Sequence, residues 1–172
     1  APSRHTAFTG VGPTAAEKWR SVASQRAIGD HAGKRGVTIG LEALNRFECY
    51  LCNTMAQLRH LIELTDHPNV RGMFDTHHAN VEEKRQTDAI RTIAPVLVHV
   101  HLSENDRGTP GSGHVNFREA LATLAEVGYD GWMMVEAFSR ADPAFANAIN
   151  VWREYNPAWH IAEQGHAFLR GE

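Results

Sequence analysis

The chain of 172 residues is 42% hydrophobic and 22% charged, a composition typical of a globular protein with a buried core. Its 17 basic and 20 acidic residues give a net charge of -3 without a basic stripe, so we expect no nucleic-acid partner. No apolar run approaches the ~18 residues of a membrane span, and the segment APSRHTAF lacks the apolar core of a signal peptide. We therefore expect one cytoplasmic domain over residues 1–172.

Capping and breaker residues divide the chain into helices and strands. A loop is expected over residues 1–12. Thr14 and Glu17 form a capping box for a helix that extends to about residue 36, and Thr54 and Gln57 form a second one for a helix that ends near residue 64. The other predicted elements are strands at 37–42, 70–75, 96–102 and 132–136, a loop at 76–80, helices at 81–94 and 117–127, a long loop at 103–116, and a helical region from 142 that Pro157 interrupts.

These strands alternate with helices at intervals of about 30 residues, which is the length of a βαβ unit. The pattern predicts an α/β fold with a parallel sheet. In the third strand, Val98, Val100 and Leu102 share one face while His99 and His101 share the other.

Each predicted strand ends in an acidic residue or a histidine: Glu42, Asp75, His101 and Glu136. The carboxyl ends of parallel strands lie at one edge of the sheet, where sites form. Three carboxylates packed there would repel one another, and a divalent cation removes that repulsion. Oxygen-rich ligation with one imidazole suits Mn²⁺, Mg²⁺ or Co²⁺ better than a structural zinc site. A single polar residue at a strand end is most simply a solvent contact or a helix cap. The metal site is therefore predicted only because such a residue ends all four strands.

Neighbouring polar residues have plainer interpretations. His77 and His78 follow Asp75, and we expect one to point into the site and the other outward. Glu104, in the long loop, is expected to be a solvated charge. Cys49 and Cys52 are most simply two reduced thiols.

The order and spacing of four segments carry a family resemblance. The segments are LEALNRFECYLCNT, FDTHHANVEE, VHVHLSENDRGTPGSGHVNF and GYDGWMMVEAF. They resemble the xylose-isomerase-like sugar isomerase/epimerase barrels, in particular the D-tagatose/D-psicose (ketose) 3-epimerases. The resemblance covers about residues 14–138 and implies a (β/α)₈ TIM barrel, whose usual length is ~250 residues. The chain would then be the C-terminal half of the barrel, with parallel strands five to eight and their helices.

The resemblance also implies a metal-dependent epimerase that exchanges a proton at C3 of a ketose through a cis-enediolate. The implied cofactor is a divalent metal, with Mn²⁺ in first place and Co²⁺, Mg²⁺ or Zn²⁺ as alternatives. The implied metal ligands are Glu42, Asp75, His101 and Glu136. Glu42 and Glu136 would also be the catalytic acid and base. Glu48, His78 and Arg107 would hold the sugar.

Other functions remain open at this point. Within the superfamily these are an aldose–ketose or hydroxypyruvate isomerase and an inosose dehydratase. Outside enzymes, the alternative is a non-catalytic half-barrel that acts in binding or assembly. An apurinic-site endonuclease would need a basic face, which the net charge argues against.

The family resemblance and the half-barrel also predict the partners. The small-molecule partner is a sugar, and we expect it to be unphosphorylated because Arg107 is the one basic residue placed in the pocket. A half-barrel exposes two strand edges, so we also expect a homo-oligomer or association with the missing half.

Overall fold

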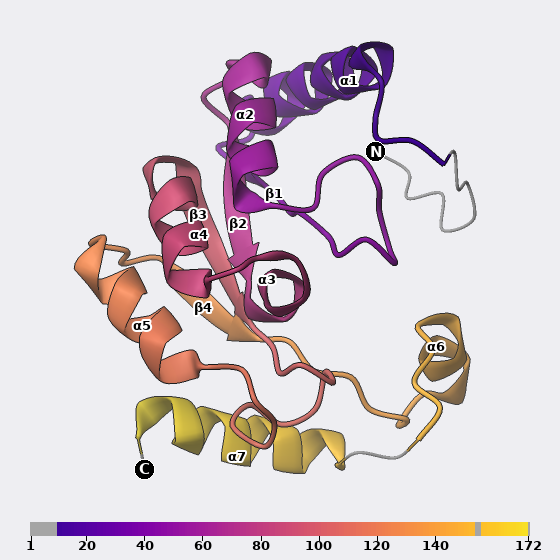
Figure 1. Cartoon of the computed structure of the whole chain (residues 1–172), viewed down its shortest axis with the longest axis vertical. Helices are drawn as coiled ribbons and strands as arrows, with labels where there is room; N and C mark the ends of the chain where they lie inside the picture. Colours follow the sequence, from indigo (N-terminus) through magenta and orange to yellow (C-terminus); the bar gives the residue numbers. More distant parts are fainter. Residues whose placement is uncertain (1–9, 154–155, 172) are drawn as a thin grey trace.

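A computed structural model describes residues 10–153 and 156–171, so most of the predicted N-terminal loop lies outside the described residues. One parallel sheet contains β1 (Ile39–Leu41), β2 (Val70–Asp75), β3 (Leu97–Leu102) and β4 (Trp132–Val135), in the order β1-β2-β3-β4. Figure 1 shows these strands with their helices beside them. The predicted α/β fold with a parallel sheet is confirmed.

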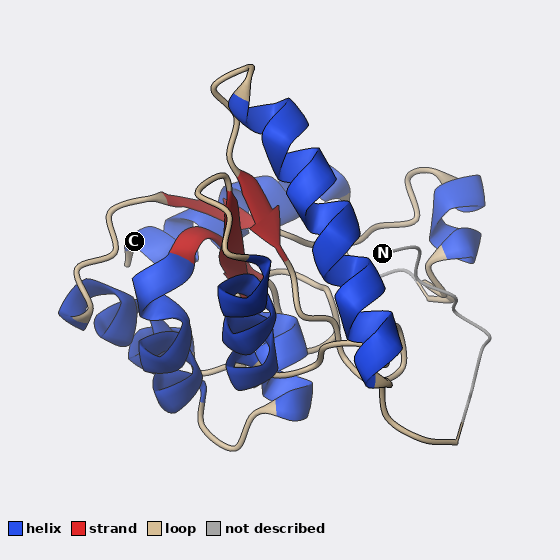
Figure 2. Cartoon of the chain, turned by 90° about the horizontal axis from the view of Figure 1, so that it is seen from above, coloured by secondary structure: helices blue, strands red, loops and turns tan. Residues whose placement is uncertain are grey.

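The helices lie before, between and after these strands. They are α1 (Ala15–Gly33), α2 (Met55–Thr65), α3 (Thr76–Glu82), α4 (Gln86–Ile93), α5 (Phe117–Glu126), α6 (Pro143–Ala148) and α7 (Ala158–Arg170), with a short 3₁₀ turn, η1 (Ala94–Val96), before β3. Both predicted capping boxes are present, at Thr14 with Glu17 and at Thr54 with Gln57. Figure 2 shows the strands in the middle, with helices packed around them.

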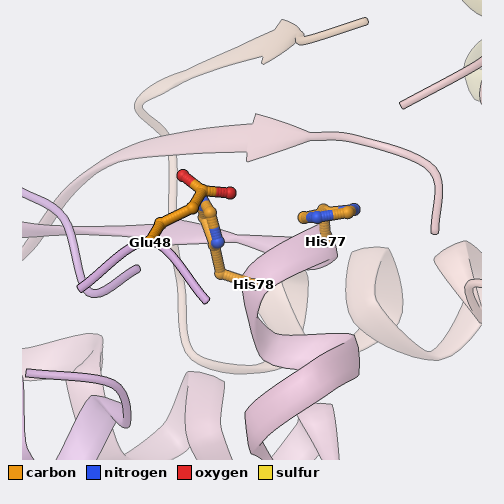
Figure 3. A group of neighbouring side chains, drawn as sticks. All are labelled: Glu48, His77 and His78. Carbon is orange, nitrogen blue, oxygen red and sulfur yellow. The ribbon is translucent and has the colours of Figure 1, made fainter. Parts of the chain in front are cut away.

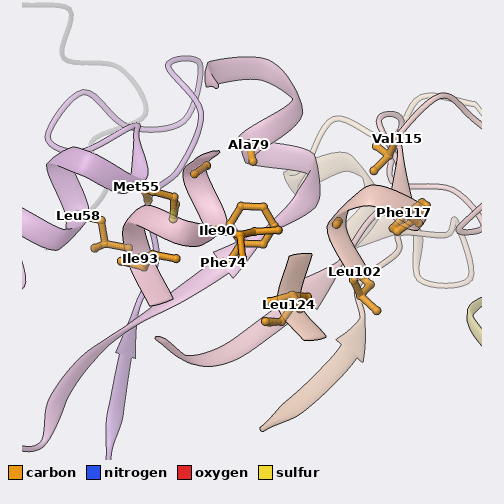
Figure 4. Packing of buried hydrophobic residues seen from close by; sticks show 14 of the residues in the cluster. Met55, Leu58, Phe74, Ala79, Ile90, Ile93, Leu102, Val115, Phe117 and Leu124 are labelled. Atoms are coloured by element: carbon orange, nitrogen blue, oxygen red, sulfur yellow. The ribbon is translucent and has the colours of Figure 1, made fainter. Parts of the chain in front are cut away.

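One face of the sheet packs on α2, α4 and α5 and forms the core. Phe74 of β2, Val100 of β3 and Ile90 of α4 are fully buried in it, and Figure 4 shows Phe74 and Ile90 among the side chains of this cluster. These residues lie on that face because strand side chains alternate with a period of two, while helical ones recur every three or four positions.

The same alternation sends polar side chains to the other side of the sheet. Val100 and Leu102 are buried in the core, whereas the rings of His99 and His101 lie edge to face with their centroids 5.1 Å apart. The alternation predicted for β3 is therefore confirmed, and the polar strand ends face away from the helical layer.

Two predicted boundaries were wrong. Residues 76–80 belong to α3 and are not a loop, because the Asp75 carboxylate caps the helix by accepting hydrogen bonds from the backbone N–H groups of His77 (2.6 Å) and His78 (3.0 Å). The helix expected at 81–94 is interrupted after Glu82. The next residue, Glu83, is extended, and its carboxylate accepts from the backbone N–H of Met55 at 2.7 Å.

The sheet is open at both sides, and β1 and β4 are its edges, as the sequence predicted. Every residue of β4 is exposed, from Trp132 at 80% to Val135 at 36%. Such an apolar edge is unusual in a stable monomer. None of the described helices is long and apolar enough to cross a membrane.

Candidate metal and sugar site

The four polar strand ends meet at one edge of the sheet. Glu42, Asp75, His101 and Glu136 each offer one nitrogen or oxygen ligand atom, and these atoms all lie within 4.8 Å of one another. The strand register explains the convergence. Asp75 is paired with His101, and the backbone N–H of Glu136 donates to the carbonyl of Leu102 at 3.1 Å.

The Nδ1 atom of His101 lies at the centre of this group. It is 3.9 Å from Glu42 Oε1, 3.7 Å from Asp75 Oδ2 and 3.6 Å from Glu136 Oε2. His101 Nδ1 and Glu42 Oε1 are buried without a hydrogen-bond partner among the described residues. Buried polar atoms normally have a partner, so this pair of atoms marks a place where a ligand would satisfy them.

The local charges shift the pKa values of the group in different directions. Burial, followed by the negative charges of Asp75 and Glu136, raises the pKa of Glu42 to about 7. Contact with Asp75 and then with Glu136 raises the pKa of His101 to about 10. Burial opposes ionisation of Asp75, but His101 and Arg107 hold its pKa well below the usual range. The carboxylates therefore favour positive charge at their centre.

Arg107 reaches the same group from the long loop. Its Nη1 donates to Asp75 Oδ2 at 3.2 Å and to Ser103 Oγ at 2.9 Å, and it also contacts the carboxylate of Glu136. The guanidinium carbon lies 5.0 Å from the ring centroid of Phe138. The backbone of Arg107 has φ 63°, an uncommon conformation for a residue with a side chain. The fold thus holds this cation beside two of the strand ends.

A second polar group lies next to the first and contains Glu48, His77 and His78, with ligand atoms within 4.8 Å of one another (Figure 3). Asn45 orients two of its members. The Asn45 backbone N–H donates to His78 Nδ1 at 3.0 Å, and the Asn45 side-chain amide donates to Glu48 Oε1 at 2.9 Å. His78 is buried, with an exposed fraction of 2%, and His77 is half-buried.

The contacts of His78 favour an acceptor oxygen in this second group. Because a backbone N–H can only donate, Nδ1 accepts, and a neutral His78 carries its proton on Nε2. Arg107 Nη2 lies 2.9 Å from that Nε2, so two donors face each other. An acceptor oxygen placed between these two nitrogens would satisfy both donors.

Glu104 is the functional feature that sequence reasoning missed. It was expected to be solvated, but its exposed fraction is 0%. Its carboxylate accepts from the backbone N–H groups of Asn105 (3.0 Å), Gly111 (2.9 Å) and Val115 (2.9 Å). Its backbone carbonyl accepts from the N–H of Arg107 at 3.0 Å. Glu104 therefore shapes the loop that carries Arg107.

The fold agrees with the comparisons with known proteins. The chain belongs to the family of xylose isomerase-like TIM barrels, whose sequence pattern matches residues 2–170. It is 41% identical to a D-psicose 3-epimerase of Ruminiclostridium cellulolyticum over 135 residues, covering 78% of this chain and 46% of that protein. It is 35% identical to a D-psicose 3-epimerase of Agrobacterium fabrum, covering 84% of this chain and 50% of that protein.

A solved structure gives the same result. The crystal structure of D-psicose 3-epimerase with D-tagatose from Clostridium cellulolyticum H10 superposes with a TM-score of 0.87 at 34% identity, covering 96% of this chain and 59% of that one. The relatives are ketose 3-epimerases, which are isomerases. The chain spans about half the length of the curated relatives that it matches.

Proposed function

We propose that the chain is the metal-binding C-terminal half of a ketose 3-epimerase, formed by strands five to eight of a (β/α)₈ barrel over residues 1–172. The length match with about half of each relative supports this assignment. So does the sheet, whose strands follow one another in chain order and leave both edges open. The names of the relatives suggest D-psicose or D-tagatose as the kind of sugar bound.

The convergence of Glu42, Asp75, His101 and Glu136 is the observation that carries the proposal. The donor set fits a divalent cation, since three carboxylates and one imidazole favour an oxygen-preferring metal, and two of the donor atoms are buried without partners. Mn²⁺ is our first choice, ahead of Co²⁺, Mg²⁺ and Zn²⁺. When bound, the cation would stabilise negative charge on the sugar oxygens.

The two glutamates would move the proton. Glu42 follows β1 and Glu136 follows β4, so they come from opposite edges of the sheet. One carboxylate would take the proton from C3. The C–H electron pair would form the C2–C3 double bond, and the π pair of the C2 carbonyl would move to its oxygen, giving a cis-enediolate. The other would return a proton to the opposite face.

Glu48, His78 and Arg107 would hold the sugar. The two donors that face each other at His78 Nε2 and Arg107 Nη2 would both be satisfied by a hydroxyl or carbonyl oxygen of the ketose. The Glu48 carboxylate, oriented by Asn45, would accept from a hydroxyl.

Deuterium exchange tests this function. The chain loaded with Mn²⁺, alone and fused to the N-terminal half of the Ruminiclostridium relative, is incubated with D-psicose or D-tagatose in D₂O. We expect deuterium at C3 and formation of the C3 epimer, at least in the fusion. The same fusion with Glu136→Gln is the control. Exchange at another carbon, or none in a fusion that binds the metal and the sugar, would contradict the proposal.

A further inference from the structure

The fold fixes the proton of His77 in a different place from that of its neighbour His78. His77 Nδ1 lies 3.0 Å from the backbone carbonyl of Glu104. A carbonyl can only accept, so Nδ1 carries the proton and Nε2 keeps its lone pair in a neutral ring. His78 has the opposite arrangement, because its Nδ1 accepts from the backbone N–H of Asn45. His77 thus presents Nε2 as an acceptor, whereas the next residue of α3, His78, presents Nε2 as a donor.

A ring nitrogen of His77 belongs to the second polar group. His77 is half-buried, and one of its ring nitrogens lies within 4.8 Å of ligand atoms of Glu48 and His78. Its Nε2 has no hydrogen-bond partner among the described residues. The rings of His77 and His78 stand nearly perpendicular, with interplanar angle 82° and centroids 5.3 Å apart (Figure 3).

We propose that His77 is a further sugar-binding residue whose Nε2 accepts a hydrogen bond from a hydroxyl of the ketose. This inference rests on the proposed function and deepens it. With Glu48 as a second acceptor and His78 as a donor, the group matches neighbouring hydroxyls, each of which has one donor and two acceptor lone pairs. His77 would therefore help to select the sugar by the position of one hydroxyl.

The tautomer can be measured without any sugar. Nitrogen-15 chemical shifts of the His77 ring, recorded at pH 8 on the chain loaded with diamagnetic Mg²⁺ and assigned by comparison with a His77→Asn sample, report which nitrogen carries the proton. We expect the proton on Nδ1 for His77 and on Nε2 for His78. A proton on Nε2 of His77 would overturn the inference.

Sugar binding tests the hydroxyl contact. Calorimetric affinities for a ketose and its monodeoxy analogues are compared between the wild type and two variants. One hydrogen bond corresponds to about a three- to tenfold change in affinity. In the wild type, removal of one particular hydroxyl should weaken binding by this factor. In His77→Asn, whose amide can still donate to the Glu104 carbonyl but cannot reach as far as Nε2, the same removal should have no effect.

Two further variants separate a direct contact from a structural effect. His77→Gln loses the donor at the position of Nδ1 but carries an oxygen near the position of Nε2. It should therefore keep part of the affinity difference between the ketose and its monodeoxy analogue. His60→Phe, at an exposed position of α2, should behave as wild type. If removal of the hydroxyl weakens binding equally in the wild type and in His77→Asn, the inference is overturned. A loaded chain that binds no ketose would contradict the proposed function and this contact with it, while the nitrogen shifts would still report the tautomer.

Discussion

The two carboxylate oxygens of Asp75 face different parts of the molecule. Oδ1 caps α3 through the backbone N–H groups of His77 and His78, while Oδ2 faces His101 at 3.7 Å and Arg107 at 3.2 Å. One residue therefore anchors the helix that carries His77 and His78 and also belongs to the strand-end group.

Substitutions at Asp75 should separate these two contributions. Asp75→Asn keeps an oxygen for the cap but loses the charge, so metal affinity should fall at least about tenfold, as for the loss of one charged ligand. Asp75→Ala should lose the metal as well and should unfold more readily than Asp75→Asn by about 1 kcal/mol, the contribution of an N-cap. Metal titration and thermal melts of the metal-free proteins measure the two effects. Equal stability of the two variants would contradict the capping role.

Metal affinity should depend on pH because the cation competes with protons. The pKa of His101 is raised to about 10 and that of Glu42 to about 7, so both groups must lose protons before they can act as ligands. Between pH 7 and 9, metal binding displaces one proton, from His101, so metal affinity should rise about tenfold per pH unit. Below pH 7 it also displaces the proton of Glu42, so the rise should be steeper. Calorimetry in buffers of different ionisation enthalpy measures the protons released. Binding that is independent of pH would rule out His101 as a ligand.

Glu136→Gln should separate metal binding from proton transfer. The amide keeps one oxygen for the cation but cannot accept a proton. We expect an unchanged fold, much of the metal affinity, and loss of C3 exchange in the fusion protein. An unaltered rate of deuterium incorporation with this variant would remove Glu136 from the mechanism.

At the scale of elements, the sequence predicted the strands well but not the connections. Apolar residues recur every two positions in a strand and every three to four in a helix, and a capping box needs only two residues close in sequence. Because these signals are local, β2, β3, the core face of β3 and both capping boxes were recognisable. The helical residues 76–80 were missed because Asp75 was interpreted as a site residue and not as a cap. Glu104 was missed because its three backbone partners, which extend to Val115, come together only in the folded loop.

The loop over residues 103–116 should depend on the charge of Glu104. In Glu104→Gln, the amide group would face a backbone N–H in place of an oxygen, which leaves a buried donor unsatisfied at a cost of about 1–3 kcal/mol. Hydrogen exchange at Gly111 and Val115 should then become faster. Glu119→Gln, the same change at an exposed position of α5, is the control and should leave these amides unchanged. Equal protection in both variants would show that the loop is held in another way.

At the scale of the whole molecule, the open edges should drive association. The side chains of β4 are exposed on both faces, from 36% to 80%, and burial of apolar surface yields roughly 25 cal/mol per Å². The edge strands also present unpaired backbone groups. We therefore expect the 172-residue chain to form oligomers at tens of micromolar, or to bind the other half of the proposed barrel through β1 and β4 when that half is supplied.

Light scattering measures this association, and substitutions locate it. Met134→Lys places a charge on the β4 edge and should shift the mass toward the monomer. Trp19→Lys removes an exposed apolar side chain from α1 and should not. A wild-type monomer with a sharp cooperative melt would show that the four strands suffice by themselves.

The convergence of the four strand ends on one cation is the central claim, and a crystal of the chain soaked in Mn²⁺ tests it most directly. We expect one anomalous peak at the carboxyl edge of the sheet, about 2.0–2.6 Å from ligand atoms of Glu42, Asp75, His101 and Glu136. A peak beside Glu48 and His77, or no peak at this edge when the metal is in excess, would contradict it.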